Sequence, residues 1–249
     1  MSKIKTPISG FIHENTAIDV LNIYAEKVKS PEHKTYHEYI EQSLVEIKNA
    51  FDIIKTGTIF KKISHFYPGC IVESIDGMNE IYITAIGSVG SDRVFETEHL
   101  DGPFFFLPFC TVLRCILAVR GNKSTVTEFP GACISVVLDT NEFVAFDYNR
   151  DSHYIWKDMN VDDNSRRIIL KLHYLVVPQF MPRPIVNLYK KAHTRYNQFM
   201  RRIFLESQKE TALSNVVNNG TKVYCFLYKK IALLTIAAGG GLLLFMICK

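Results

Sequence analysis

The chain has 249 residues, of which 47% are hydrophobic and 22% are charged, and this balance is typical of a folded globular protein. The net charge is only +4 and the Lys and Arg residues form no dense block, so the composition excludes a strongly basic nucleic-acid-binding protein. Six cysteines without a CxxC pair exclude a zinc ribbon, a thioredoxin-like redox motif and a small disulfide scaffold, and reduced thiols are expected.

The N-terminal part, residues 1–68, is predicted to be a helical region that packs on the core. Apolar residues recur at helical spacing in residues 16–29 and 32–55. Ser30 followed by Pro31 is typical of a helix start. The histidines of this region are expected to be exposed or structural rather than metal ligands: His13, His33, His37 and His65.

From about residue 69 the sequence changes to short runs of β-branched and aromatic residues separated by Gly, Asn and Asp. Residues 69–180 are therefore predicted to form a core of short strands, either a sandwich or a barrel. The overall class is mainly β with flanking helices. The predicted strands are 80–86, 93–99, 111–119, 124–128, 133–138, 142–146, 153–157 and 166–177.

The C-terminal part returns to helical periodicity after the prolines of residues 178–184. Residues 185–217 are predicted as a long helix within a basic region, 181–222. Its cations are expected either against anionic lipid headgroups or on a solvated face packed on the barrel, and the sequence leaves both open.

Residues 231–248, IALLTIAAGGGLLLFMIC, form an 18-residue stretch without a charge and are flanked by lysines. This length is at the short end of what crosses a bilayer, so a transmembrane tail anchor is predicted. The N-terminus has no signal-peptide pattern. The expected localisation is therefore a membrane, with a single C-terminal anchor and the catalytic domain in the cytosol.

The stretch EHLDGPF, residues 98–104, places His99 and Asp101 two residues apart ahead of a Gly-Pro turn. In an extended segment such residues point to the same face. His153 opens a later predicted strand, 54 residues after His99. Two imidazoles and one carboxylate on neighbouring strands are the facial triad of non-haem Fe(II) enzymes, which leaves three coordination positions open for cosubstrate and O2.

A dicarboxylate cosubstrate such as 2-oxoglutarate chelates the metal at one end and requires a cation at the other, best a guanidinium. The last predicted strand opens with Arg166 and Arg167. Arg167 shares one face with Lys171, whereas Arg166 shares the drier face. If the wetter face lines the pocket, Arg167 with Lys171 nearby is the cosubstrate anchor, and if burial dominates, the anchor is Arg166.

These segments resemble the double-stranded β-helix Fe(II)/2-oxoglutarate oxygenases, and within them the aspartyl/asparaginyl β-hydroxylase-like branch. The resemblance covers about residues 80–178. It rests on HLDGP (99–103), TVLRCILAV (111–119), VAFDYNRDSHYIW (144–156) and RRIILKLHYLVVP (166–178).

The resemblance implies a jelly-roll or cupin-like core that binds Fe(II) and 2-oxoglutarate. It implies that His99 and His153 are ligands, that Arg166 or Arg167 grips the distal carboxylate, and that Arg114 contacts cosubstrate or substrate. The β-hydroxylase of EGF-like domains lacks the carboxylate ligand, whereas Asp101 is present here. Its catalytic domain is luminal behind an N-terminal anchor, so the resemblance supports the chemistry better than an EGF-domain substrate.

The predicted reaction is hydroxylation of a protein side chain, of the Asp or Asn type, or of a membrane-associated small molecule. O2 and 2-oxoglutarate are consumed, and 2-oxoglutarate is decarboxylated to succinate. One alternative is a non-catalytic, membrane-tethered β-barrel binding module. Another is a cupin-like enzyme that uses a different metal or does not use 2-oxoglutarate. Asp147 is interpreted as a turn residue that accepts local backbone N–H groups.

Overall fold

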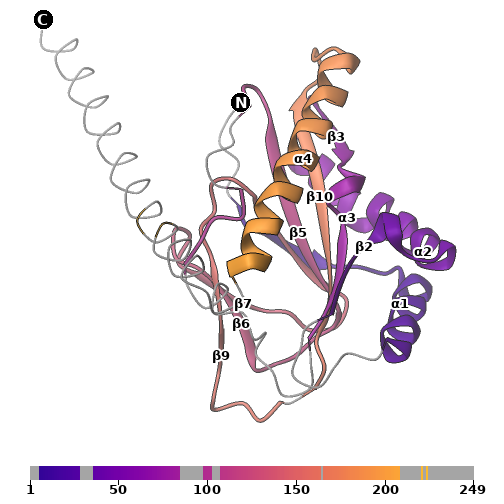
Figure 1. The fold of residues 1–249 in the computed structure, drawn as a ribbon, viewed down its shortest axis with the longest axis vertical. Helices are drawn as coiled ribbons and strands as arrows, with labels where there is room; N and C mark the ends of the chain where they lie inside the picture. The colour runs from indigo at the N-terminus through magenta and orange to yellow at the C-terminus, as the bar shows by residue number, and fades with distance from the viewer. Residues whose placement is uncertain are drawn as a thin grey trace, which may run out of the picture.

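The computed structural model describes residues 6–28, 36–84, 98–102, 107–163 and 165–207, together with Gly220 and Val223. Within them the chain forms two antiparallel sheets flanked by helices (Figure 1). The predicted β core with flanking helices is therefore confirmed. In the described part of the chain, no helix is long and apolar enough to cross a membrane. The predicted membrane span, residues 231–248, lies outside the described residues.

The larger sheet has the strand order β1-β8-β5-β10-β4-β2, and β3 pairs with β10 beyond the end of β4. Its strands are β1 (Ile8–Phe11), β2 (Tyr36–Tyr39), β3 (Cys70–Ser74), β4 (Glu80–Ile83), β5 (Thr111–Arg120), β8 (Glu142–Asp147) and β10 (Ile168–Pro178). The smaller sheet has the order β7-β6-β9, formed by β6 (Thr125–Phe129), β7 (Ile134–Val137) and β9 (Tyr154–Lys157). From β4 to β10 the chain passes repeatedly between the two sheets, as it does in a jelly roll.

The central strands β5 and β10 are buried on both faces. One face packs on the helices α1 (Asn15–Lys27), α2 (Val45–Thr56) and α3 (Thr58–Phe66). The other face meets the smaller sheet, where the ring centroids of Phe129 and Phe146 are 5.1 Å apart. Because side chains alternate along a strand, residues of β5 and β10 point either to these three helices or to the opposite face. That opposite face meets the smaller sheet along one part and Val186 of the C-terminal helix along another, where Val112, Leu175 and Val177 pack.

The helix predicted over residues 32–55 is only partly right. Residues 29–35 lie outside the described residues, Tyr36–Tyr39 forms β2, and a short 3-10 helix η1 (Ile40–Gln42) precedes α2. β2 pairs in register with all four residues of β4. Ladder hydrogen bonds and packing against a buried strand outweigh a weak local helical preference. The strands β1 and β3 were also not predicted.

The other predicted strands agree with observed ones to within a few residues, except that only residues 98 and 99 of the predicted strand 93–99 are described. A second 3-10 helix, η2 (Asp76–Met78), lies between β3 and β4. The helix predicted over 185–217 begins as α4 at Arg183 and is described to Ser207.

Candidate metal centre

His99 and His153 face each other across an antiparallel pair of backbone hydrogen bonds. The N–H of each residue donates to the C=O of the other over 3.0 Å. Residues paired in this way carry their side chains on the same face of a sheet. The ring centroids are 4.6 Å apart, and both side chains are buried. Two segments 54 residues apart in sequence thus present two imidazoles at one point.

Asp101 follows in a bend that is fixed on both sides of Gly102. The N–H of Gly102 donates to the C=O of Tyr148 over 2.9 Å, and the side-chain amide of Asn149 donates to the C=O of Gly102 over 2.7 Å. A Cβ atom at Gly102 would lie 2.2 Å from a ring carbon of Tyr148. Only glycine fits here, and its close approach to the ring positions the preceding carboxylate.

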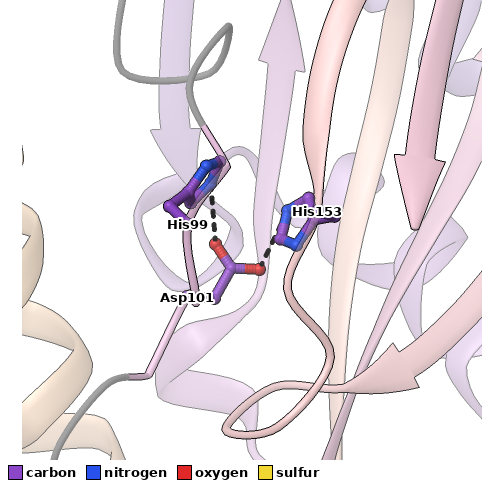
Figure 2. Close-up of side chains that lie close together, drawn as sticks. All are labelled: His99, Asp101 and His153. Atoms are coloured by element: carbon purple, nitrogen blue, oxygen red, sulfur yellow. Dashed lines mark ion pairs between the residues drawn. The ribbon is translucent and has the colours of Figure 1, made fainter. Parts of the chain in front are cut away.

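The three predicted ligands converge (Figure 2), with one ligand atom of each within 4.8 Å of the others. His99 Nε2 lies 3.9 Å from Asp101 Oδ1, and His153 Nε2 lies 3.6 Å from Asp101 Oδ2. Among the described residues Oδ2 has no hydrogen-bond partner although it is buried. A buried carboxylate oxygen without a donor, beside two imidazoles, fits a divalent metal ion.

The protonation states also fit a metal. Burial opposes ionisation of Asp101, but Arg114 and the two imidazoles outweigh it and lower the pKa of the carboxyl to about 2. Burial lowers the pKa of His153 to about 3 against the attraction of Asp101. At neutral pH the carboxylate is therefore charged and the imidazole neutral, as metal ligation requires. The Nδ1 atom of His153 lies 3.4 Å from the C=O of Asp151, which directs Nε2 toward the centre.

Arg114 on β5 contacts the aspartate rather than open space. Its Nη1 lies 2.6 Å from Asp101 Oδ1, its Nε donates to His173 Nε2 over 2.9 Å, and its guanidinium lies 4.8 Å from the ring centroid of Tyr148. The sequence predicted that Arg114 contacts cosubstrate or substrate. In the structure it orients a predicted ligand, and His173 on β10 orients the arginine in turn.

Arg167 is buried at the start of β10, on the face that points to the interior between the sheets. Its backbone C=O accepts the backbone N–H of Thr84, and its backbone N–H donates to the Thr84 hydroxyl, each over 3.0 Å, at the end of the ladder between β4 and β10. Its side chain is 6% exposed, and no described residue accepts a hydrogen bond from its guanidinium. Burial lowers the pKa of Arg167 to about 10, so the group remains cationic at neutral pH. An unpaired buried cation calls for an anionic ligand.

Arg166 lies on the opposite face of β10, and its guanidinium is already hydrogen-bonded within the protein. Its guanidinium donates to the C=O of Ala25 over 3.0 Å and to the C=O of Val28 over 3.2 Å, at the C-terminal end of α1. It therefore caps a helix and does not reach the interior. Of the two arginines left open by the sequence, only Arg167 faces the same side of the sheet as Lys171.

Lys171 belongs to a second buried charge cluster that the sequence did not reveal. Its Nζ lies 3.5 Å from Glu80 Oε1 and 4.6 Å from the ring centroid of Tyr82. Glu80 also pairs with His37 and, over 2.5 Å, with Arg201 of α4. A lone glutamate within the apolar strand NEIYI was the available signal, because a buried charge needs partners. His37 was expected to be exposed on a helix and instead lies on β2 against this carboxylate.

The turn after β8 has the structural role predicted for it. Asp147 Oδ1 accepts the backbone N–H of Asn149 over 3.0 Å. The hydroxyl of Tyr148 donates to Asn197 Oδ1 of α4 over 2.9 Å. Burial raises the pKa of Asp147 to about 6 despite that backbone donor. The turn therefore holds Tyr148 between Gly102 and Arg114, next to the metal ligands.

No protein-family model and no curated protein matches the chain. Among solved structures it is similar to the viral collagen prolyl hydroxylase vCPH from Paramecium Bursaria Chlorella virus-1 in a 2-oxoglutarate complex, with 13% identity, a TM-score of 0.45, and coverage of 71% of this chain and 97% of that chain. It is also similar to a prolyl hydroxylase from Trichoplax adhaerens in complex with a hypoxia inducible factor peptide. The identity is 14%, the TM-score is 0.42, and the match covers 68% of this chain and 82% of that chain. A third similar structure is HygX from Streptomyces hygroscopicus with nickel, 2-oxoglutarate and hygromycin B bound. The identity is 8%, the TM-score is 0.45, and the match covers 70% of this chain and 83% of that chain.

At such low identities and TM-scores these likenesses describe what the chain resembles and assign it to no family. None of the three is described as an aspartyl/asparaginyl hydroxylase, so that branch remains a prediction.

Proposed function

We propose that this protein is an Fe(II)- and 2-oxoglutarate-dependent dioxygenase. One observation carries the proposal: the metal-ligand triad of His99, Asp101 and His153 and the buried guanidinium of Arg167 lie on the same side of the larger sheet. Ile169, two residues from Arg167 on that face, packs in one cluster with Phe129 and Phe146, which contact His153. A metal site alone is compatible with many functions. A metal site beside a buried cation that lacks a carboxylate is suited to a ligand that chelates at one end and is anionic at the other.

Fe(II) would be held by Nε2 of both histidines and by Asp101 Oδ2, with Oδ1 kept on Arg114. When bound, the metal and 2-oxoglutarate would together supply the oxidising chemistry that uses O2, releases succinate and CO2, and places one oxygen atom on a C–H group. The residues of the chain keep the carboxylate ionised, fix its orientation and leave one face of the metal site without a protein ligand.

The cosubstrate would lie along the inner face of β10. Arg167 would pair with the distal carboxylate of 2-oxoglutarate, as a planar guanidinium does best. Lys171 lies on the same inner face of β10, between Arg167 and His173 along the strand, and is paired with Glu80. Arg114 would contribute through Asp101 rather than by direct contact with the cosubstrate.

The surroundings of the site would exclude water from the reacting centre. The His153 ring packs on Phe146 and Phe129, with centroid distances of 4.7 and 5.8 Å. All three ligands are buried, at 2–7% exposure. A dry, fixed site strengthens the electrostatic interactions of its charged groups and protects reactive species from side reactions.

The substrate proposed is a protein side chain of the Asp or Asn type, or a membrane-associated small molecule. The resemblance of HLDGP and VAFDYNRDSHYIW to the β-hydroxylase-like branch favours the first. The uncharged stretch 231–248, proposed as a tail anchor that leaves residues 69–180 in the cytosol, favours substrates at a membrane surface.

The test is optical titration of the full chain in detergent without oxygen. Fe(II) and then 2-oxoglutarate are added, and the visible charge-transfer band of the iron–keto-acid chelate is recorded. We expect a band with the unmodified protein and none with His153→Ala. A folded protein that binds Fe(II) but gives no band with 2-oxoglutarate would indicate the cupin-like alternative. A folded protein that binds neither would be a binding module.

A further inference from the structure

Helix α4 has an inward face that is fixed by polar contacts. Asn197 accepts the hydroxyl of Tyr148 over 2.9 Å, and His193 Nε2 lies 3.8 Å from the Sγ of Cys110. Both residues are buried, as is Val186, which lies two helical turns before His193. These contacts determine which side of α4 is turned away from the sheets.

The outward face combines apolar and basic side chains. Ile185, Leu188 and Phe199 are 38%, 61% and 59% exposed, and at 100° per residue they project from one side of the helix. Lys191 and Arg195 are exposed between them. Three large apolar side chains in one exposed row exceed the scattered exposure that a soluble surface normally carries.

The positive charge of this face has no nearby compensation in the sequence. No Asp or Glu occurs from residue 164 to residue 205. The inward cations Lys190 and Arg201 use carboxylates of other elements, Glu73 and Glu80. Among the described residues, no carboxylate forms an ion pair with Lys191 or Arg195.

We propose that the outward face of α4 docks on an anionic lipid bilayer. The apolar side chains would enter the boundary between headgroups and acyl chains, while the two cations would meet the lipid phosphates and carboxylates. A second copy of this chain is a poorer partner, because a two-fold contact would bring the same cations against each other. Docking does not depend on the metal site, because none of its ligands lies on α4.

The single tryptophan of the chain makes the test direct. Trp156 lies on β9, away from α4. In the full chain, Trp156→Phe combined with Phe199→Trp moves the only tryptophan to the outward face. Its emission is measured with vesicles of brominated phosphatidylcholine, with or without phosphatidylserine. The unmodified chain, which reports from Trp156, is the matched control.

We expect bromine to quench the tryptophan at position 199 in vesicles that contain phosphatidylserine, and to leave Trp156 unquenched. Adding Lys191→Gln and Arg195→Gln should weaken docking about 30-fold, at about 1 kcal/mol per cation. Leu188→Trp with Trp156→Phe repeats the measurement should the first variant fail to fold. Absence of quenching of the tryptophan at position 199 and at position 188 overturns the proposal. Quenching that is equal in vesicles with and without phosphatidylserine also overturns it. Protection of position 199 by self-association, seen in sedimentation, also overturns it.

Discussion

Nη1 of Arg114 lies 2.6 Å from Oδ1 of Asp101, and both side chains are buried. One oxygen of the carboxylate is thereby occupied, while Oδ2 is left toward the two imidazoles. The arginine is itself held by His173. The candidate metal ligand is therefore oriented before any metal binds, which limits the reorganisation that binding requires.

Replacing Arg114 should weaken metal binding without touching a ligand. For Arg114→Gln we expect roughly 10–100-fold lower affinity for Co(II), measured by calorimetry, because the ligand carboxylate loses its orienting partner. The metal-free protein should also lose roughly 3–5 kcal/mol of unfolding free energy, since Asp101 is left as an unpaired buried charge. The control is Arg120→Gln, at a residue on the same strand as Arg114, which removes a partly exposed ion pair with Glu26 of α1. Unchanged Co(II) affinity in Arg114→Gln would contradict an orienting role.

A glycine at position 102 should be required for stability and metal binding, because the backbone there lies against the ring of Tyr148. A methyl group placed 2.2 Å from the ring must displace either the ring or the bend that carries Asp101. We expect Gly102→Ala to destabilise the protein by roughly 1–3 kcal/mol and to lower Co(II) affinity as well. Gly131→Ala, where no atom lies within 4 Å of the new methyl, should change neither quantity. Equal behaviour of the two variants would show that the bend tolerates a side chain.

The ligand triad could be predicted because part of its information is local. His99 and Asp101 are two apart, which puts them on one face of an extended segment, and His153 opens a strand. The pairing of His99 with His153, 54 residues further along the chain, is not local, and the resemblance of the flanking segments to a known family indicated it. The information that decides between Arg166 and Arg167 is not local in the sequence. It depends on which face of β10 the helices cover, and α1 occupies the face of Arg166.

The cluster around Glu80 shows a stronger limit of sequence reasoning. Its partners come from β2, β10 and α4, and Arg201 is 121 residues away along the chain. The helical spacing of residues 32–55 also concealed that His37 lies on a strand. Pairing between distant segments decides both features, and no periodicity within one segment records it.

Substitutions of Arg167 and of Arg166 should have opposite effects on melting temperature, and only the first should reduce 2-oxoglutarate affinity. Burial lowers the pKa of Arg167 from its ordinary value to about 10, which corresponds to roughly 3 kcal/mol of unfavourable burial. Arg167→Met should therefore raise the melting temperature in the absence of 2-oxoglutarate, while lowering 2-oxoglutarate affinity by roughly 100-fold or more. Arg166→Met should leave 2-oxoglutarate affinity unchanged and lower the melting temperature, because α1 loses its C-terminal cap. The assignment is wrong if Arg166→Met is the variant that loses 2-oxoglutarate.

The stability of the metal-free protein should fall in mild acid because of His153. Burial holds the pKa of this imidazole at about 3 in the folded protein, against an ordinary value of 6.5. Between these values the unfolded chain binds a proton that the folded chain does not, so stability is full above about pH 6.5 and declines as pH falls toward 3. The slope from this residue is about 1.4 kcal/mol per pH unit. In His153→Phe, whose ring can pack on Phe129 and Phe146, that part of the slope should vanish in urea titrations from pH 7 to pH 4. If both proteins show the same slope, the folded protein accommodates the charged imidazole and His153 is not buried as described.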